Sequence, residues 1–335
     1  PNSQMKFEQT EYINSDLIRL FEQIVLGTNG AKYKHLDVGE SVAHTDNPLS
    51  FSLRRKEQLI ANITFCKRPF GLYLRYFAFD KRFQSTGKAR MNPKSQIKKE
   101  IENVFLDITS QFPGNQNYCY AYIDAKNVRS KWMSETFGFR TKAKLNTQTF
   151  SRVFPKALAN LKKEAISSEL SQIIENNYGH YTAYFTHFFE NGTVFSLFND
   201  NGDRLAFAQF HHVRWEIQRF PGKLGGLWVK LLPFIPFLRK IIQPKEHTFL
   251  VPDIVCNPSG NIADVQRLFE AVLAHENLHS MLWWNDTRDP IYQRAQKHFN
   301  WGLLHHIIGI AEVDVVIRGD YEPKEPIFIA AFDMI

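Results

Sequence analysis

A short glycine-bearing loop carries the clearest chemical signal in this sequence. It spans residues 84–90 and consists of Gln84, Ser85, Thr86, Gly87, Lys88, Ala89 and Arg90. Small residues at Gly87 and Ala89 let the backbone approach an anion closely. Backbone N–H groups that lead into a helix N-terminus attract phosphate, and the cationic side chains of the loop offset its charge. The loop is therefore predicted to hold a pyrophosphate.

The elements on either side suit such a loop. An alternating, aromatic-rich run at residues 72–79 predicts a strand before it, and an amphipathic run at residues 95–112 predicts a helix after it. Pro93 delays the start of that helix, because proline is tolerated in the first turn only. A strand at residues 118–123 and a short helix at residues 128–137 are expected next.

Two motifs in this region resemble those of the GNAT superfamily of N-acetyltransferases. Residues 76–90 read YFAFDKRFQSTGKAR, and the positions Arg/Gln-x-x-Gly-x-Gly/Ala of the family's core motif fall on Gln84, Gly87 and Ala89. Residues 123–139 read IDAKNVRSKWMSETFGF and resemble the second motif, with Asn127 at the start of its helix. The resemblance covers about residues 45–150, and the one helix and one strand between the motifs match the family's order.

The resemblance implies acetyl-CoA as co-substrate and direct transfer of its acyl group to an amine. The acceptor would be a small molecule or an amino-acid-like molecule. The cofactor-binding residues that the resemblance implies are those of the loop, together with Phe77, Ala78, Phe79 and Asn127. A backbone N–H near Phe79, where the family's strand splays, would polarise the thioester carbonyl.

The sequence does not identify the groups that would transfer protons in this reaction. The family often places a tyrosine, as the acid for the departing thiolate, where this chain has Ser134, whose hydroxyl is a poor proton donor. The side chains expected near the mouth of the site are Asp80, Tyr122 and Asp124, and the sequence selects no base among them. Two alternative functions follow: a non-catalytic acyl-CoA-binding protein, and an aminoacyl transferase of the tandem type.

A zinc hydrolase is a further alternative. The run His275-Glu276-Asn277-Leu278-His279 is a literal H-E-x-x-H. Zinc binding would need both histidines on one helical face, but the residues that follow read as a strand. The adjacent pairs His211-His212 and His305-His306 would point to opposite faces of a strand. No bound metal is expected.

The second half repeats the order of elements in the first. Strands are expected at residues 49–54 and 59–65 in the first half, and at 181–189, 193–198, 204–211, 248–255, 279–284, 311–318 and 327–332 in the second. Helices are expected at residues 14–26, 262–275 and 290–299, and a helical connection at residues 150–171.

These elements indicate an α/β (α+β) fold of two tandem GNAT-like domains, at residues 1–155 and 156–335. Each is expected to be a mixed, mostly antiparallel twisted sheet flanked by helices. The loop at residues 257–261 lacks the phosphate pattern, so the second domain is expected to be degenerate and to bind no cofactor.

Composition and charge further limit the ligands, partners and cellular location that are expected. A length of 335 residues suits two domains, and a formal net charge of +7 suits a polyanionic ligand. No long basic run and no zinc-finger spacing favours nucleic acid. The odd set Cys66, Cys119 and Cys256 favours reduced thiols and a cytoplasmic location. A homodimer is left open.

One long apolar stretch lies at residues 225–242. It contains Lys230, Arg239 and Lys240 and is broken by Pro233 and Pro236, so it is a poor membrane-spanning helix. Stable membrane insertion is therefore not expected. An interdomain packing element is the favoured interpretation, and docking on a membrane or binding an acyl chain are the alternatives.

Overall fold

The computed structural model describes residues 6–27, 31–80, 96–112 and 118–333. The described strands form one sheet in the order β1-β3-β4-β5-β6-β13-β7-β12-β11-β10-β9-β8, and β2 pairs with β10 beside that path. The strands are β1 (Phe7–Thr10), β2 (Lys32–His35), β3 (Pro48–Arg55), β4 (Gln58–Lys67), β5 (Leu72–Phe79), β6 (Cys119–Asp124), β7 (Phe139–Ser151), β8 (Leu161–Ala165), β9 (Thr193–Phe198), β10 (Arg204–Arg219), β11 (His247–Cys256), β12 (Ser280–Asp286) and β13 (Ala311–Arg318).

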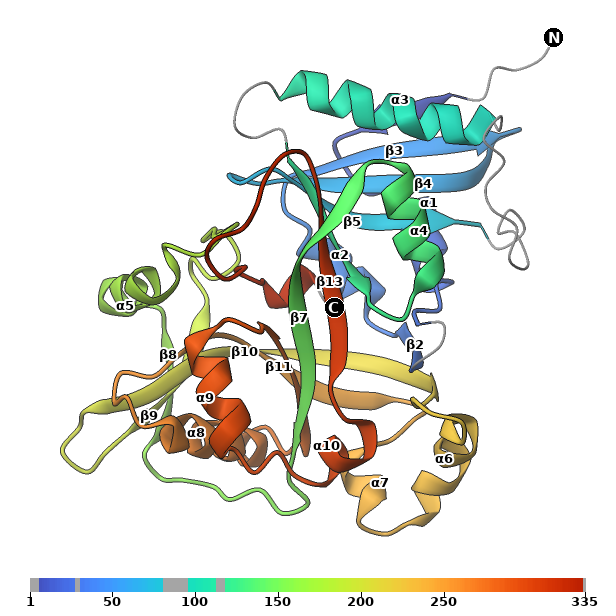
Figure 1. Cartoon of the computed structure of the whole chain (residues 1–335). Helices are drawn as coiled ribbons and strands as arrows, with labels where there is room; N and C mark the ends of the chain where they lie inside the picture. Colours follow the sequence, from blue (N-terminus) through green and yellow to red (C-terminus); the bar gives the residue numbers. More distant parts are fainter. Residues whose placement is uncertain (1–5, 28–30, 81–95, 113–117, 334–335) are drawn as a thin grey trace.

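Helices cover the sheet of each half (Figure 1). They are α1 (Ser15–Glu22), α2 (Val38–Ala43), α3 (Gln96–Gln111), α4 (Val128–Thr136), α5 (Ser168–Tyr178), α6 (Gly225–Leu231), α7 (Leu238–Ile241), α8 (Ile262–His275), α9 (Pro290–His298) and α10 (Leu303–Ile308), with 3-10 turns η2 (Leu232–Phe234) and η3 (Ala331–Asp333). The mixed, mostly antiparallel sheet flanked by helices confirms the expected fold class. No helix among the described residues is long and apolar enough to cross a membrane.

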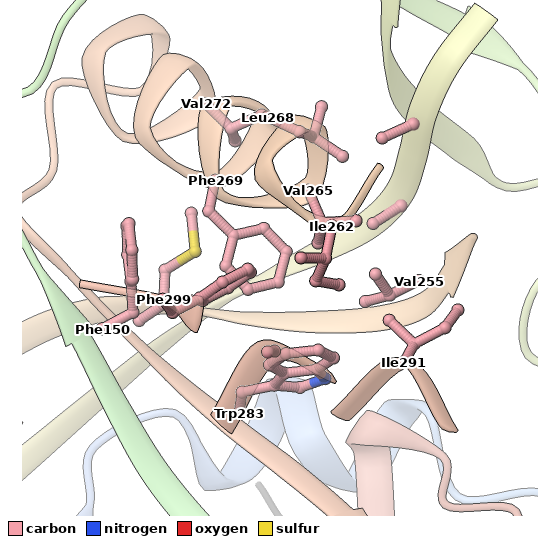
Figure 2. Close-up of a cluster of buried hydrophobic side chains, with 14 of the residues drawn as sticks. Phe150, Val255, Ile262, Val265, Leu268, Phe269, Val272, Trp283, Ile291 and Phe299 are labelled. Atoms are coloured by element: carbon pink, nitrogen blue, oxygen red, sulfur yellow. The ribbon is translucent and has the colours of Figure 1, made fainter. Parts of the chain in front are cut away.

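Helical periodicity in the sequence produces the two main packing layers. On α3, the buried residues Ile101, Val104, Phe105 and Ile108 recur every three or four positions and cover the first half of the sheet. On α8, the buried residues Val265, Leu268, Phe269 and Val272 show the same spacing. Figure 2 shows Phe269 of α8 among Phe150, Trp283 and Phe299, in the core of the second half.

The last strand of the chain joins the two halves. β13 lies between β6 and β7 and is antiparallel to both, from Val313 opposite Asp124 to Arg318 opposite Cys119. On its other edge, β7 continues past β13 to pair with β12, from Leu145 opposite Asp286 to Ser151 opposite Ser280. In Figure 1, β7 and β13 run side by side from the upper to the lower half. The division at residue 155 stays a prediction.

Three expected elements differ from the structure. Residues 150–171 hold the end of β7, the edge strand β8 and the start of α5 rather than a helical connection. Residues 181–189 form turns, because their aromatic side chains pack around Phe328 instead of alternating across a sheet. Residues 327–332 form one isolated bridge to Thr182 and then the turn η3.

A buried ion network fixes the tail of the chain against the first half. The Arg68 side chain is 2% exposed, and its Nε and Nη2 donate to Asp46 at 3.0 and 2.9 Å. Its Nη1 and Nη2 also donate to the carboxylate of Asp333, both at 2.6 Å. The Tyr73 hydroxyl donates to the Asp333 carbonyl at 2.8 Å. Arg68 therefore pairs with two buried carboxylates from distant parts of the sequence, and Arg75 Nη1 lies 3.6 Å from Asp333 as a second cation.

Replacing Arg68 by methionine should strongly destabilise the protein. The change keeps an apolar stem but leaves the buried Asp46 carboxylate without its guanidinium partner and leaves Asp333 with the longer contact to Arg75 at 3.6 Å. Breaking buried pairs in this way costs about 3–5 kcal/mol of unfolding free energy. Denaturant titration measures the loss. The matched control Arg54→Met removes the partly exposed Arg54–Asp16 pair and should cost less than about 1 kcal/mol. Equal losses in the two variants would contradict this assignment.

Candidate active site

Two parallel strands separate in the middle of the first half. β5 and β6 pair only at Leu72 with Cys119 and at Tyr73 with Tyr120. Beyond that point β5 follows β4 and β6 follows β13, so each strand stays with its other neighbour. The register of β5 against β4 also shifts by one residue at Arg75, which is a bulge that bends the strand. The result is a gap within the sheet.

The gap opens into a cavity of about 470 Å³ that continues to the second half. Helix α4, which follows β6, forms one wall through Met133 and Phe137. On the opposite side, β2, β10 and β11 contribute Tyr33, Trp215 and Phe249. Tyr33 and Trp215 are stacked with ring centroids 3.9 Å apart. The walls are mainly aromatic and aliphatic, so the cavity suits a ligand with an apolar body.

The predicted cofactor-binding residues fall into three groups. Phe77 and Asn127 line the cavity, and the Asn127 side chain also caps α4 by accepting the N–H of Ser130 at 3.0 Å. Ala78 is buried in the cluster beneath α1, and Phe79 pairs with Ala61 at the end of β5. The predicted phosphate loop, residues 84–90, lies outside the described residues.

The three candidate proton-transfer residues differ in their surroundings: Tyr122 and Asp124 line the cavity, whereas Asp80 follows the end of β5. Tyr122 lines the cavity from β6, and its buried hydroxyl has no hydrogen-bond partner among the described residues. Burial, together with nearby Asp333, raises the pKa of this phenol above its usual range. Asp124 also lines the cavity, but one of its oxygens accepts the N–H of Lys126 at 2.8 Å. The backbone N–H of Asp80 donates to the Ile60 carbonyl at 2.8 Å.

Ser134 is present at the cavity but its hydroxyl is used within its own helix. It lies on α4 among the lining residues, and its Oγ donates to the Lys131 carbonyl at 2.7 Å. A hydroxyl held in this way is poorly placed to donate a proton to a ligand. The structure therefore does not favour Ser134 as a proton donor at this position.

Two histidines of the cavity were missed in the sequence. His35 ends β2, and His247 begins β11. Burial lowers the pKa of His247 to about 4, and burial with the nearby Arg75 guanidinium lowers the pKa of His35 to about 4. His247 Nε2 lies 3.2 Å from Ser280 Oγ. No motif marks either residue, because segments far apart in sequence bring them together.

The corresponding gap in the second half is filled by the protein itself. β11 and β12 pair only at Leu250 with Met281, so they also separate. The tail crosses this gap: the N–H of Ile327 donates to Asp286 at 2.8 Å, and the N–H of Ala331 donates to Asp253 at 2.9 Å. Phe328 and Ala330 between them are buried. The gap between β5 and β6 therefore opens into a cavity, whereas the gap between β11 and β12 is occupied by the tail.

The H-E-x-x-H run does not form a zinc-binding helix. α8 ends at His275, and Asn277 has a left-handed φ of 56°. His279 lies beyond the helix, with Nδ1 3.1 Å from the Arg152 carbonyl oxygen. The two histidines therefore do not share a helical face. Among the described residues, no three His, Cys, Asp or Glu side chains are grouped as metal ligands.

No family model and no curated protein matches this sequence, but its fold is known from solved structures. N-myristoyltransferase from Saccharomyces cerevisiae, with bound myristoyl-CoA, matches with a TM-score of 0.57 at 8% identity, over 96% of this chain and 85% of that one. A tandem GNAT protein from the clavulanic acid biosynthesis pathway matches with a TM-score of 0.52 at 8% identity, over 95% of this chain and 100% of that one.

A third structure agrees with these two. A GCN5-related glucosamine N-acetyltransferase region of a fungal multi-domain GH3 β-N-acetylglucosaminidase matches with a TM-score of 0.55 at 9% identity, over 94% of this chain and 38% of that one. Identities this low show the fold alone. The chain therefore has the GNAT fold in its tandem form, as expected from the sequence.

The buried histidines should make the protein sensitive to acid. His247 takes up a proton near pH 6.5 in the unfolded chain but only near pH 4 in the folded one. Its contribution to stability is therefore complete above pH 6.5 and is lost as the pH falls toward 4, by on the order of 3 kcal/mol. His247→Gln should reduce this slope of unfolding free energy against pH. His180→Gln, at an exposed histidine outside the cavity, is the matched control. An unchanged slope in His247→Gln would contradict the assignment.

Proposed function

We propose that this protein is an acyl-CoA-dependent N-acyltransferase. The observation that carries the proposal is the gap between β5 and β6, which opens directly into a cavity shared by both halves. The acyl donor would enter through the gap, and the amine acceptor would occupy the part of the cavity beside β2, β10 and β11. Transfer would occur where the two parts meet, near Tyr122.

Several features support the donor's place in the first half. The predicted phosphate loop follows β5 in the sequence, and β5 is one of the two strands that border the gap. The facing edges of β5 and β6 lack each other as partners beyond Tyr73, and such edges can pair with an extended chain. In the second half, the tail already occupies the equivalent gap.

The size and lining of the cavity bear on which acyl group the donor carries. Acetyl-CoA is the donor implied by the sequence motifs. A volume of about 470 Å³ lies in the range of about 300–1,000 Å³ that is typical of sites for drug-sized ligands. The yeast enzyme of similar fold was solved with myristoyl-CoA, whose acyl chain is long and apolar. These features favour either a longer acyl chain or an acceptor with an apolar body.

The proposed reaction is direct. The amine nitrogen attacks the thioester carbonyl carbon, the C–S bond breaks, the nitrogen loses a proton and the thiolate gains one. An apolar cavity favours the neutral amine over the ammonium ion, because burial disfavours the charged form. Tyr122 is the proposed proton donor to the thiolate, since it lines the cavity and its buried hydroxyl has no hydrogen-bond partner among the described residues.

One observation favours a second candidate, a non-catalytic acyl-CoA-binding protein. The Ser134 hydroxyl, at the position of the family's usual acid, is bonded to the Lys131 carbonyl. If Tyr122 does not replace that acid, the gap would bind the donor without promoting transfer. Release of free thiol in the presence of a panel of amines separates an enzyme from a binding protein.

Acyl-CoA should raise the melting temperature, and the predicted loop should be required for this effect. A ligand at about one hundred times its Kd adds about 2.7 kcal/mol of stability, enough to shift the melting temperature by several degrees. Gly87→Glu places a side chain and a negative charge where phosphate is expected, so it should abolish the shift. Asn201→Glu, in an exposed turn of the second half, should retain the shift. A shift that survives Gly87→Glu would remove the loop from the proposal.

Tyr122→Phe should reduce turnover without weakening donor binding. Loss of a general acid typically lowers kcat by about 10²-fold or more, whereas the phenyl ring preserves the cavity wall. The matched change Ser134→Ala removes a hydroxyl from the same cavity and should leave kcat within about twofold, because that hydroxyl bonds its own helix. Steady-state kinetics with thiol detection, beside acyl-CoA titrations, measures both. Unchanged kcat in Tyr122→Phe would assign the acid elsewhere.

A further inference from the structure

A short helical hairpin projects from one corner of the second half (Figure 1). It spans residues 224–242 and contains α6, η2 and α7. Large apolar side chains on its outer side are exposed to solvent, among them Phe234 at 83%, Leu224 at 61% and Phe237 at 59%. Leu227, Trp228 and Leu231 are exposed beside them. We call these six residues the docking face. An exposed apolar patch of this density marks an interaction site.

Packing within the protein does not require the docking face. The hairpin is attached by its inner side, where Leu232, Leu238, Ile241 and Ile242 are buried. They pack against Phe220 and Leu304 in one cluster. The interpretation of this segment as a packing element therefore accounts for the inner side alone. The outer side, where Phe234 is 83% and Phe237 is 59% exposed, is not covered by the described residues and is free for a partner.

The charge around the docking face identifies the chemistry of that partner. No acidic residue occurs between Glu216 and Glu246. In the same stretch, the exposed cations are Lys223, Lys230, Arg239, Lys240 and Lys245. None of these five forms a salt bridge within the part of the chain that the structure describes. The docking face thus has apolar side chains in a stretch that contains cations without a salt bridge. Such a face complements a partner that has an apolar interior and negative charges at its surface.

We propose that the docking face binds the surface of a lipid bilayer that contains anionic lipids. The apolar side chains would enter the boundary between headgroups and acyl chains, and the cations would lie at the level of the headgroups. Pro233 and Pro236 break the segment into short turns that present Phe234 and Phe237 at its tip. Insertion is therefore shallow, in agreement with the absence of a spanning helix among the described residues.

The surroundings of the hairpin extend this surface and connect it with the cavity. Phe154 is 67% exposed, and its ring lies 4.5 Å from Nζ of Lys240, so it adds to the apolar area. Phe220, Ile242 and Leu304 belong to the inner cluster of the hairpin and also line the cavity. The membrane surface would thus lie directly beside the site. The docking itself does not depend on the proposed transferase activity.

Vesicle flotation tests the proposal directly with the full chain. The protein should bind vesicles of phosphatidylcholine with a minority of phosphatidylserine, and bind pure phosphatidylcholine vesicles at least tenfold more weakly. Phe234→Ser combined with Phe237→Ser should lower the partition coefficient on anionic vesicles at least tenfold. The matched control, Tyr12→Ser with Leu106→Ser, removes two exposed apolar side chains far from the hairpin and should bind as the unchanged protein does.

The remaining outcomes each decide against the proposal. Equal binding by the hairpin variant and the control variant would overturn it, as would failure of the unchanged protein to bind anionic vesicles. Gel filtration of the same samples provides a separate check. A dimer that becomes a monomer only in the hairpin variant, without vesicle binding, would assign the face to a second copy of the chain. Because no acyl-CoA is present, these results are independent of the proposed activity.

Discussion

The pairing of β13 with β6 and β7 is the constraint on which the rest of the structure depends. It brings the last strand of the chain into the first half and makes one continuous sheet of both halves. Beyond Tyr73, β6 stays paired with β13 and β5 stays paired with β4, and the bulge at Arg75 bends β5. The gap within the sheet lies where each of the two strands keeps only its other neighbour. The cavity opens from this gap.

The same strand also determines where the tail of the chain goes. After β13 the tail crosses the separated strands β11 and β12, where buried carboxylates of Asp253 and Asp286 accept its N–H groups. The tail then reaches the first half, where Arg68 donates hydrogen bonds to Asp333 of the tail. The two similar gaps thus differ. The gap between β11 and β12 is filled by the tail, and the gap between β5 and β6 opens into an apolar cavity. Under the proposed function, this asymmetry would leave the gap between β5 and β6 as the entry for the acyl donor.

Much of the fold could be predicted from the sequence, because local pattern and tertiary packing agree there. The strand Leu72–Phe79, the helix Ile262–His275 and the strand Ala311–Arg318 have the predicted bounds. Asn127 begins its helix as expected. The prediction failed at residues 181–189 and 327–332, where aromatic alternation suggested strands. Those side chains are buried against one another, and their backbone groups bond to turns and buried carboxylates instead of a sheet.

The sequence by itself determined the class of fold, the bounds of several strands and helices and the phosphate-loop hypothesis, since these depend on neighbours along the chain. Only the tertiary structure placed β13 between β6 and β7 and brought His35 and His247 to the cavity beside Tyr122. It also showed that the Ser134 hydroxyl is bonded within its own helix and that one side of residues 224–242 is exposed. Periodicity records which residues share a face of one element, but it cannot record which distant element covers that face.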